Sequence, residues 1–119
     1  MPHGMTSAGF HAKHLAGSTR RLCAYLEGRQ LDDAALAEAR AESHGDEEPA
    51  ALLDGIRGAF SHYVSLVLAL PPEAFGDVRE VGRKRIPVTA VSLAIHIAEH
   101  GQRHVGQLVS AAKLVEAGR

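Results

Sequence analysis

The sequence is poor in cysteine and in aromatic residues, and both shortages limit what the chain can be. Its one cysteine, Cys23, cannot form an intramolecular disulfide, and no cysteine-based metal motif is present. Tryptophan is absent and aromatic residues make up 4% of the chain, whereas alanine and leucine are abundant. Because strands favour aromatic and β-branched residues while alanine and leucine favour helices, this composition predicts a helical protein.

Long apolar runs and an excess of charge are also missing. No stretch reaches the roughly 18 apolar residues of a membrane span, and the first residues do not resemble a signal peptide. The formal net charge of -1 provides no field that would attract nucleic acid or an anionic membrane. We therefore expect a cytoplasmic protein with neither nucleic acid nor membrane as a partner. The length suits a single domain, residues 1–119, with 1–6 as a loose N-terminal lead-in.

Apolar residues recur at helical spacing in the first forty residues. The pattern predicts a first helix at Ala8–Glu27, which would begin behind an N-cap at Ser7. A short second helix follows at Leu31–Arg40, with Asp32 as its cap and an end near residues 43–45.

Two further helices are predicted in the rest of the chain. Asp46 would cap a third helix that runs to Leu70, where Pro71 stops it. Residues 79–87 have little helical character and predict a short extended or hairpin-like connection. Thr89 would cap the last helix, Ala90–Glu116. Three long helices and one short helix joined by brief loops indicate an all-α, up-down helix bundle.

Histidine is the residue that the sequence has in excess. Of eight histidines, three recur at every fourth position, at His96, His100 and His104. Four residues advance a helix by about 400°, so successive histidines lie about 40° apart and about 6 Å along the axis. Two imidazoles at this spacing can bind one metal ion.

Two of these histidines fall in an apolar seam of the last helix. A 4-3-4-3 pattern, which faces a bundle interior, is formed by Leu93, Ile97, His100, His104, Gln107, Ala111 and Leu114. His96 lies beside this seam. A second stripe should widen the apolar face, and it consists of Val91, Ile95, Ala98, Val105, Val109 and Ala112. A buried polar group without a partner costs roughly 1–3 kcal/mol. Either a metal or hydrogen bonds to carboxylates, hydroxyls or water must therefore satisfy the rings, and we favour the metal.

A third metal ligand should come from another helix that faces this seam. His14 is the best candidate because it lies close to the inner face of the first helix, and His11, one turn earlier, is its competitor. His62 on the third helix is less attractive. Cys23 points about 180° away from His14, so we interpret it as a packing residue. Three neutral histidines leave coordination positions open for water or substrate, as catalytic metal sites do.

The groups around the His pair do not favour a protease. Zinc proteases place a glutamate directly after the first histidine, whereas here Glu99 precedes His100 and is rotated about 100° from it. Arg103 or Gln107 could orient a substrate, and no residue is assigned a catalytic role. The only basic cluster, residues 83–85, fits a solvated loop better than an anion-binding rim.

Three segments resemble those of the DinB-like family of metal-binding helix bundles, a superfamily that includes thiol-dependent S-transferases. They are His14-Leu15-Ala16-Gly17-Ser18, residues 81–87 and residues 96–107 with their His-x3-His pattern. The resemblance implies a metal site of His14, His100 and His104, occupied by zinc, nickel or another divalent ion. It also implies a four-helix bundle, often dimeric, and in some members transfer of a low-molecular-weight thiol such as bacillithiol or mycothiol.

The family has a further long helix before the segment with its first ligand, which this sequence does not contain. Either the short helix fills the gap or a second subunit covers an exposed apolar face, and we expect a homodimer. The expected function is that of a metal-dependent hydrolase or thiol S-transferase. The alternatives are a non-catalytic stress-related or binding bundle with a structural or vestigial metal site, and a metal-free bundle with hydrogen-bonded core histidines.

Overall fold

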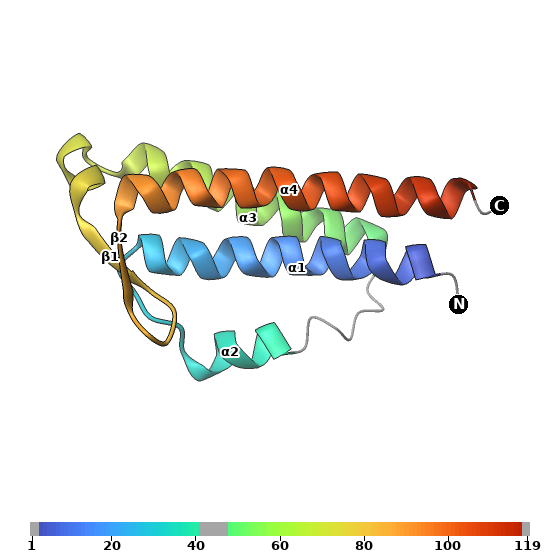
Figure 1. The fold of residues 1–119 in the computed structure, drawn as a ribbon, viewed down its shortest axis with the longest axis horizontal. Helices are drawn as coiled ribbons and strands as arrows, with labels where there is room; N and C mark the ends of the chain where they lie inside the picture. The colour runs from blue at the N-terminus through green and yellow to red at the C-terminus, as the bar shows by residue number, and fades with distance from the viewer. Residues whose placement is uncertain (1–2, 41–47, 118–119) are drawn as a thin grey trace.

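The computed structural model describes residues 3–40 and 48–117, and these form a helix bundle with one small hairpin (Figure 1). Its elements are α1 (His3–Leu26), α2 (Asp33–Arg40), α3 (Pro49–Ala69), the 3-10 helix η2 (Pro72–Gly76), β1 (Val78–Val81), β2 (Ile86–Thr89) and α4 (Ala90–Ala117). The all-α class and the set of three long helices and one short helix are therefore confirmed.

The long helix α1 is the centre of the bundle and packs along both α3 and α4. In Figure 1, α1 and α3 run in one direction, α4 runs in the opposite direction, and α2 lies on the return path between α1 and α3. This is the up-down order expected from brief connections. Among the described residues, no helix combines the length and the apolar character needed to cross a membrane.

The main apolar core lies at the hairpin end of the bundle. It is formed by Cys23, Tyr25 and Leu26 of α1 with Ala90, Leu93, Ala94 and Ile97 of α4. Cys23 is fully buried there, as expected of a packing residue, and its burial raises the pKa of its thiol to about 11. The thiol is therefore protonated at neutral pH, which agrees with a packing role.

Two of the predicted helix caps are present. The Ala35 N–H donates to Asp32 Oδ1 over 2.8 Å at the start of α2, and the Ser92 N–H donates to Thr89 Oγ1 over 3.2 Å at the start of α4. Each bond satisfies a backbone donor that the first helical turn leaves unpaired. The predicted end of α2 near residues 43–45 lies outside the described residues.

Two predicted helix starts are wrong. The first helix begins at His3, so residues 3–6 are not a loose lead-in and Ser7 is not an N-cap. Nothing in residues 3–6 stops a helix, since they contain no proline and their one glycine costs only about 1 kcal/mol. The third helix has Glu48 at its N-cap position and Pro49 in its first turn, and Asp46 lies outside the described residues.

The predicted hairpin-like connection is a two-stranded antiparallel hairpin, in which Val78 pairs with Thr89 and Val81 with Ile86. Its turn needs a left-handed backbone at Gly82, where φ is 79°, a conformation that glycine adopts without strain. The Arg79 side chain donates from Nε to the Leu26 carbonyl oxygen over 2.7 Å. This bond fixes the hairpin to the end of α1 and thereby positions the start of α4.

Helices α3 and α4 approach closely at Gly101. The Tyr63 hydroxyl of α3 donates to the Ala94 carbonyl oxygen of α4 over 2.8 Å. Seven residues further along α4, the Phe60 ring of α3 packs against Gly101. A Cβ added at Gly101 would lie 2.6 Å from Phe60 Cζ. Gly101 therefore determines how closely α4, including the neighbouring His100, packs against α3.

We expect Gly101→Ala to lower the free energy of unfolding by about 1 kcal/mol. Overpacking costs about 1–3 kcal/mol, which exceeds the gain of about 1 kcal/mol from replacing a helical glycine. Gly106→Ala is the matched control on the same helix, because a Cβ there meets nothing within 4 Å, and it should stabilise the protein. Urea unfolding measures both variants, and a stabilised Gly101→Ala would contradict this account of the α3–α4 contact.

Candidate metal centre

Three histidines from two helices meet between α1 and α4. His14 extends from α1, while His100 and His104 lie one turn apart on α4. One ring nitrogen from each lies within 4.8 Å of the others. The ring centroids of His100 and His104 are 4.3 Å apart, and those of His14 and His104 are 4.8 Å apart. With Zn–N bonds of about 2.1 Å, tetrahedral ligands lie roughly 3.4 Å apart, so the rings would need to close by only about 1 Å.

The other histidines lie outside this group. His11 and His96 flank it, with ring centroids 6.2 Å from His104 and 6.0 Å from His100, but they are not part of the group whose ring nitrogens all lie within 4.8 Å of one another. His62, the least attractive candidate ligand, does not belong to the group either, and its Nε2 lies 3.3 Å from Glu27 Oε1, which accepts a hydrogen bond from it. Of the three candidates for the third position, His14 is the one that the structure brings together with the His-x3-His pair.

The two α4 rings have nitrogen atoms that nothing in the described chain satisfies. Nδ1 of His100 and Nδ1 of His104 are buried and have no hydrogen-bond partner. Hydrogen bonding to carboxylates or hydroxyls, the metal-free explanation for core histidines, therefore does not account for these two atoms. Two orphaned nitrogens beside a third imidazole fit a divalent ion that prefers nitrogen ligands, such as zinc or nickel.

The surroundings of the two α4 rings, His100 and His104, disfavour their protonated forms. Burial, followed by the neighbouring His104, lowers the pKa of His100 to about 4. Burial, and then the electrostatic effect of the neighbouring His14 ring, also lower the pKa of His104, and a hydrogen bond with Gln107 acts in the opposite direction. Metal ions bind the unprotonated ring, so protons compete weakly for these nitrogens at neutral pH.

A comparison with protein families agrees with this geometry. The family model of the DinB superfamily matches residues 2–108. The chain belongs to the DinB superfamily. Members of this superfamily generally bind divalent metals, and the resemblance seen in the His-x3-His segment is thereby confirmed. Neither the curated proteins nor the solved structures gave a match to the chain.

The apolar seam of this DinB-superfamily chain is only partly as predicted. Leu93 and Ile97 are buried and His104 is 9% exposed, whereas Gln107 is exposed and does not belong to the packed seam. The second stripe does not widen the packed face, because its described side chains are all exposed. The side chains of Ala111, Ala112 and Leu114 lie outside the description.

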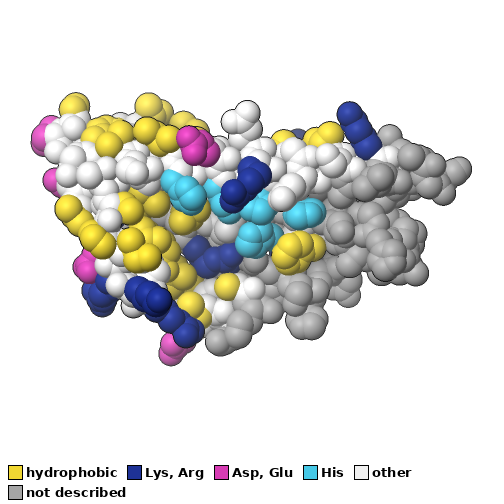
Figure 2. Space-filling view, viewed as in Figure 1, with side chains coloured by type: hydrophobic (Ala, Val, Ile, Leu, Met, Phe, Trp, Pro, Cys, Tyr) yellow, Lys and Arg dark blue, Asp and Glu magenta, His cyan; other side chains and the backbone are white. Residues whose placement is uncertain are grey.

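The cluster opens onto one face of the molecule. Figure 2 shows histidine side chains gathered in one patch along α1 and α4, with basic side chains beside them. Phe10 stacks on His14 with a centroid distance of 5.5 Å. Arg103 is exposed, and its positive charge contributes to the lowered pKa of both His100 and His104. A small molecule could therefore reach the rings from solvent.

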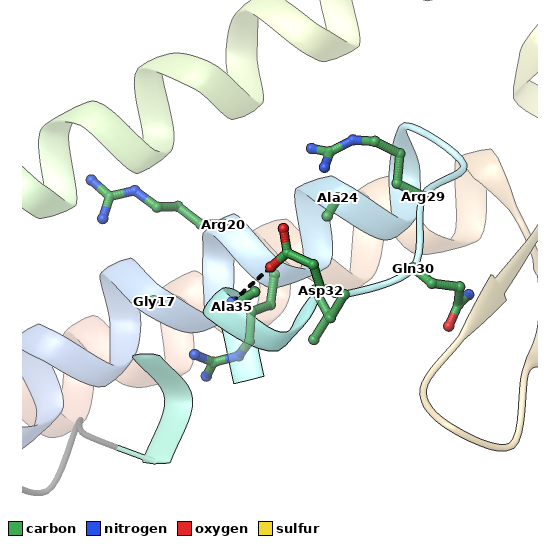
Figure 3. Close-up of a pocket in the computed structure, with 9 residues that line it drawn as sticks. Gly17, Arg20, Ala24, Arg29, Gln30, Asp32 and Ala35 are labelled. Carbon is green, nitrogen blue, oxygen red and sulfur yellow. Dashed lines mark hydrogen bonds between the residues drawn. The ribbon is translucent and has the colours of Figure 1, made fainter. Parts of the chain in front are cut away.

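A separate pocket of about 150 Å³ lies between α1 and α2 and contains none of the clustered histidines (Figure 3). Three arginines line it, Arg20, Arg21 and Arg29, with Asp32 among them. Figure 3 shows Arg20 pointing away from Asp32 toward α3, where its guanidinium donates to the Gly55 carbonyl oxygen over 3.3 Å. The guanidinium of Arg29 donates to Glu27 over 3.0 Å, so the charged ends of Arg20 and Arg29 both make contacts with residues outside the pocket lining.

The basic cluster at residues 83–85 is exposed in the hairpin turn, as expected of a solvated loop. Arg85 pairs with Glu80 across the turn over 3.6 Å.

Sequence reasoning missed how far the row of imidazoles extends. Nδ1 of His11 is also buried without a partner, although this residue was expected only as a competitor of His14. Its signal was present in the sequence, since residues three apart on a helix lie on the same side. The result is a group of five neighbouring rings, of which His14, His100 and His104 have ring nitrogens within 4.8 Å of one another.

Proposed function

We propose that this protein binds one divalent metal ion, zinc or nickel, through His14, His100 and His104, and uses it as a metal-dependent thiol S-transferase or hydrolase. The observation that supports the proposal best is the pair of buried, unpartnered Nδ1 atoms beside a third imidazole from another helix. The expected cytoplasmic setting belongs to this proposal, because low-molecular-weight thiols are kept reduced there.

The charges around the cluster suit an anionic nucleophile. A bound divalent ion lowers the pKa of an adjacent thiol or water, so that the nucleophile forms at neutral pH. Imidazole side chains add no negative charge to the site, and the groups that act on the pKa of His100 are histidines and Arg103, with no carboxylate among them. Arg103 and His96 lie at the exposed rim, where they would contact and orient a co-substrate.

One observation weighs against hydrolysis. It also agrees with the alternative of a non-catalytic stress-related or binding protein with a structural or vestigial site. The group of possible ligands among the described residues consists of histidines alone, and the nearby Glu99 is exposed. A hydrolase needs a general base within hydrogen-bond reach of its water, and a carboxylate is a common choice. Thiol transfer needs no such base once the thiolate has formed, so it is the reaction that we favour.

Thiol transfer also gives the direct test. Protein is stripped with a chelator, reloaded with zinc or nickel, and mixed with bacillithiol or mycothiol and an alkyl halide. The sulfur bonds to carbon, the halide leaves and the thiol proton goes to solvent, so the loss of free thiol measures the reaction. We expect metal-loaded protein to accelerate this loss and His100→Ala to remove the acceleration. No acceleration by protein shown to hold its metal would favour the non-catalytic alternative.

A further inference from the structure

The three histidines of α4 pass from solvent into the bundle over two helical turns. His96 is exposed, His100 is half-buried and His104 is 9% exposed. The ring centroids of His96 and His100 are 6.0 Å apart, and those of His100 and His104 are 4.3 Å apart. His100 therefore has an imidazole neighbour on each side, one in solvent and one in the interior.

His96 and His100 form a second pair at the spacing that lets two imidazoles on one helix bind one ion. Exposed side chains change rotamer in picoseconds to nanoseconds, so His96 can close the remaining distance to an ion on His100. This outer pair lacks the third ring that His14 provides to the inner group of His14, His100 and His104. It should therefore hold an ion more weakly than the three-histidine centre.

The α1 side of the cluster is less open to an ion than the His96 side. The Phe10 ring lies against both imidazoles of α1, with centroids 5.6 Å from His11 and 5.5 Å from His14. His11 is half-buried, and its Nδ1 is enclosed without a partner. An ion that came from this side would meet an apolar ring first. In the described part of the chain, His96 makes its ring contact with another imidazole, that of His100.

The charges of α4 also favour the outer pair as the point of entry. The positive charge of Arg103 contributes to the lowered pKa of both His100 and His104, and it repels a metal ion as it repels a proton. His96 lies about 10 Å from Arg103 along the helix axis, roughly one Debye length at physiological ionic strength. Glu99 is exposed about 60° round the helix from His96, and its carboxylate attracts cations.

We propose that His96 and His100 capture the divalent ion from solvent and pass it to the three-histidine centre. The inference rests on the metal centre proposed above. His96 and His100 bind the ion first, and it gives up some of its water. His96 then releases it as His104 and His14 bind, while His100 holds it throughout. His96 is therefore an entry ligand, which changes the rates at which the ion arrives and leaves but does not belong to the final site.

The entry pair should become measurable once the inner site is weakened. In His104→Ala, the remaining zinc affinity should depend on His96, so that the double variant His96→Ala, His104→Ala binds about tenfold more weakly or less. In the wild-type background, His96→Ala should leave the affinity unchanged. Isothermal titration calorimetry with zinc measures all four proteins, and circular dichroism checks that each is folded. Equal affinities of His104→Ala and the double variant would contradict the entry pair.

Stopped-flow mixing tests the entry role directly. Loading is followed by mixing metal-free protein with zinc and a fluorescent zinc indicator, and release by mixing zinc-loaded protein with excess chelator. We expect His96→Ala to slow both rate constants about tenfold, which corresponds to a barrier about 1.4 kcal/mol higher. Because both fall by the same factor, the dissociation constant and the final zinc content should stay at their wild-type values. His96→Glu, which supplies another zinc ligand at the same position, should restore fast loading.

His62→Ala is the matched control, because it removes an imidazole that is also exposed, by 51%, but lies on α3 outside the cluster. Both of its rate constants should equal those of the wild type. Unchanged rate constants for His96→Ala at full zinc content would overturn the entry role and leave the metal centre intact. Faster release with unchanged loading would make His96 a permanent ligand and would overturn it too. Wild-type protein that takes up no zinc would contradict the metal centre and this inference with it.

Discussion

Replacing His100 and His104 together with alanine should abolish metal binding. These two residues provide two of the three candidate ligand side chains, and the Nδ1 atom of each is buried without a partner. Side chains that merely orient metal ligands contribute about 10–100-fold to affinity, so loss of two ligands should cost more than about 1,000-fold. Elemental analysis after incubation with zinc or nickel should give one metal per wild-type chain and less than a tenth of a metal per variant chain.

His96→Ala is the matched control for this experiment. His96 carries the same side chain on the same helix, one turn before His100, but it is exposed and lies outside the group of three. Its variant should keep most of the metal. If His96→Ala and the double variant lost metal equally, the ligand assignment would be wrong even though the protein binds metal.

Zinc should raise the thermal unfolding midpoint of the protein by about 12–24 °C. An ion held by both α1 and α4 binds the folded chain and not the unfolded one, which stabilises the fold by about 4 kcal/mol at a thousand times the dissociation constant. For a domain of this size, each kcal/mol shifts the midpoint by about 3–6 °C. Thermal unfolding followed by circular dichroism, with chelator and then with excess zinc, measures the shift.

The double His100→Ala, His104→Ala variant separates this effect from general effects of zinc on the surface. It retains His62 and Glu27, which lie together on the exposed side of the bundle and could bind zinc weakly. We expect its midpoint to be the same with chelator and with zinc. A zinc shift of equal size in this variant would place the stabilising ion elsewhere.

Local patterns of the sequence predicted the elements and most of their ends. Helical spacing gave the three long helices, Asp32 and Thr89 were recognisable as caps, and the low helical character of residues 79–87 indicated the hairpin. These features depend on residues within a turn or two of one another, so they can be predicted from the sequence alone. The start of α1 was wrong because Ser7 is a good cap that an already continuing helix does not need.

The relative placement of helices was less predictable. The seam on α4 identified His100 and His104, but the choice between His14 and His11 depends on how α1 is rotated against α4, which no local pattern records. The second stripe shows the same difficulty. Its spacing identified an apolar face, yet the structure was needed to show that α1 and α3 leave Val91 and Ile95 exposed.

Diffraction from crystals grown with zinc, collected at the zinc absorption edge, tests the central claim most directly. We expect one anomalous peak per chain, between the rings of His14, His100 and His104 and within about 2.1 Å of a nitrogen of each. A peak confined to another place, such as His62 beside Glu27, or no peak in protein given excess zinc, would contradict the three-histidine metal centre.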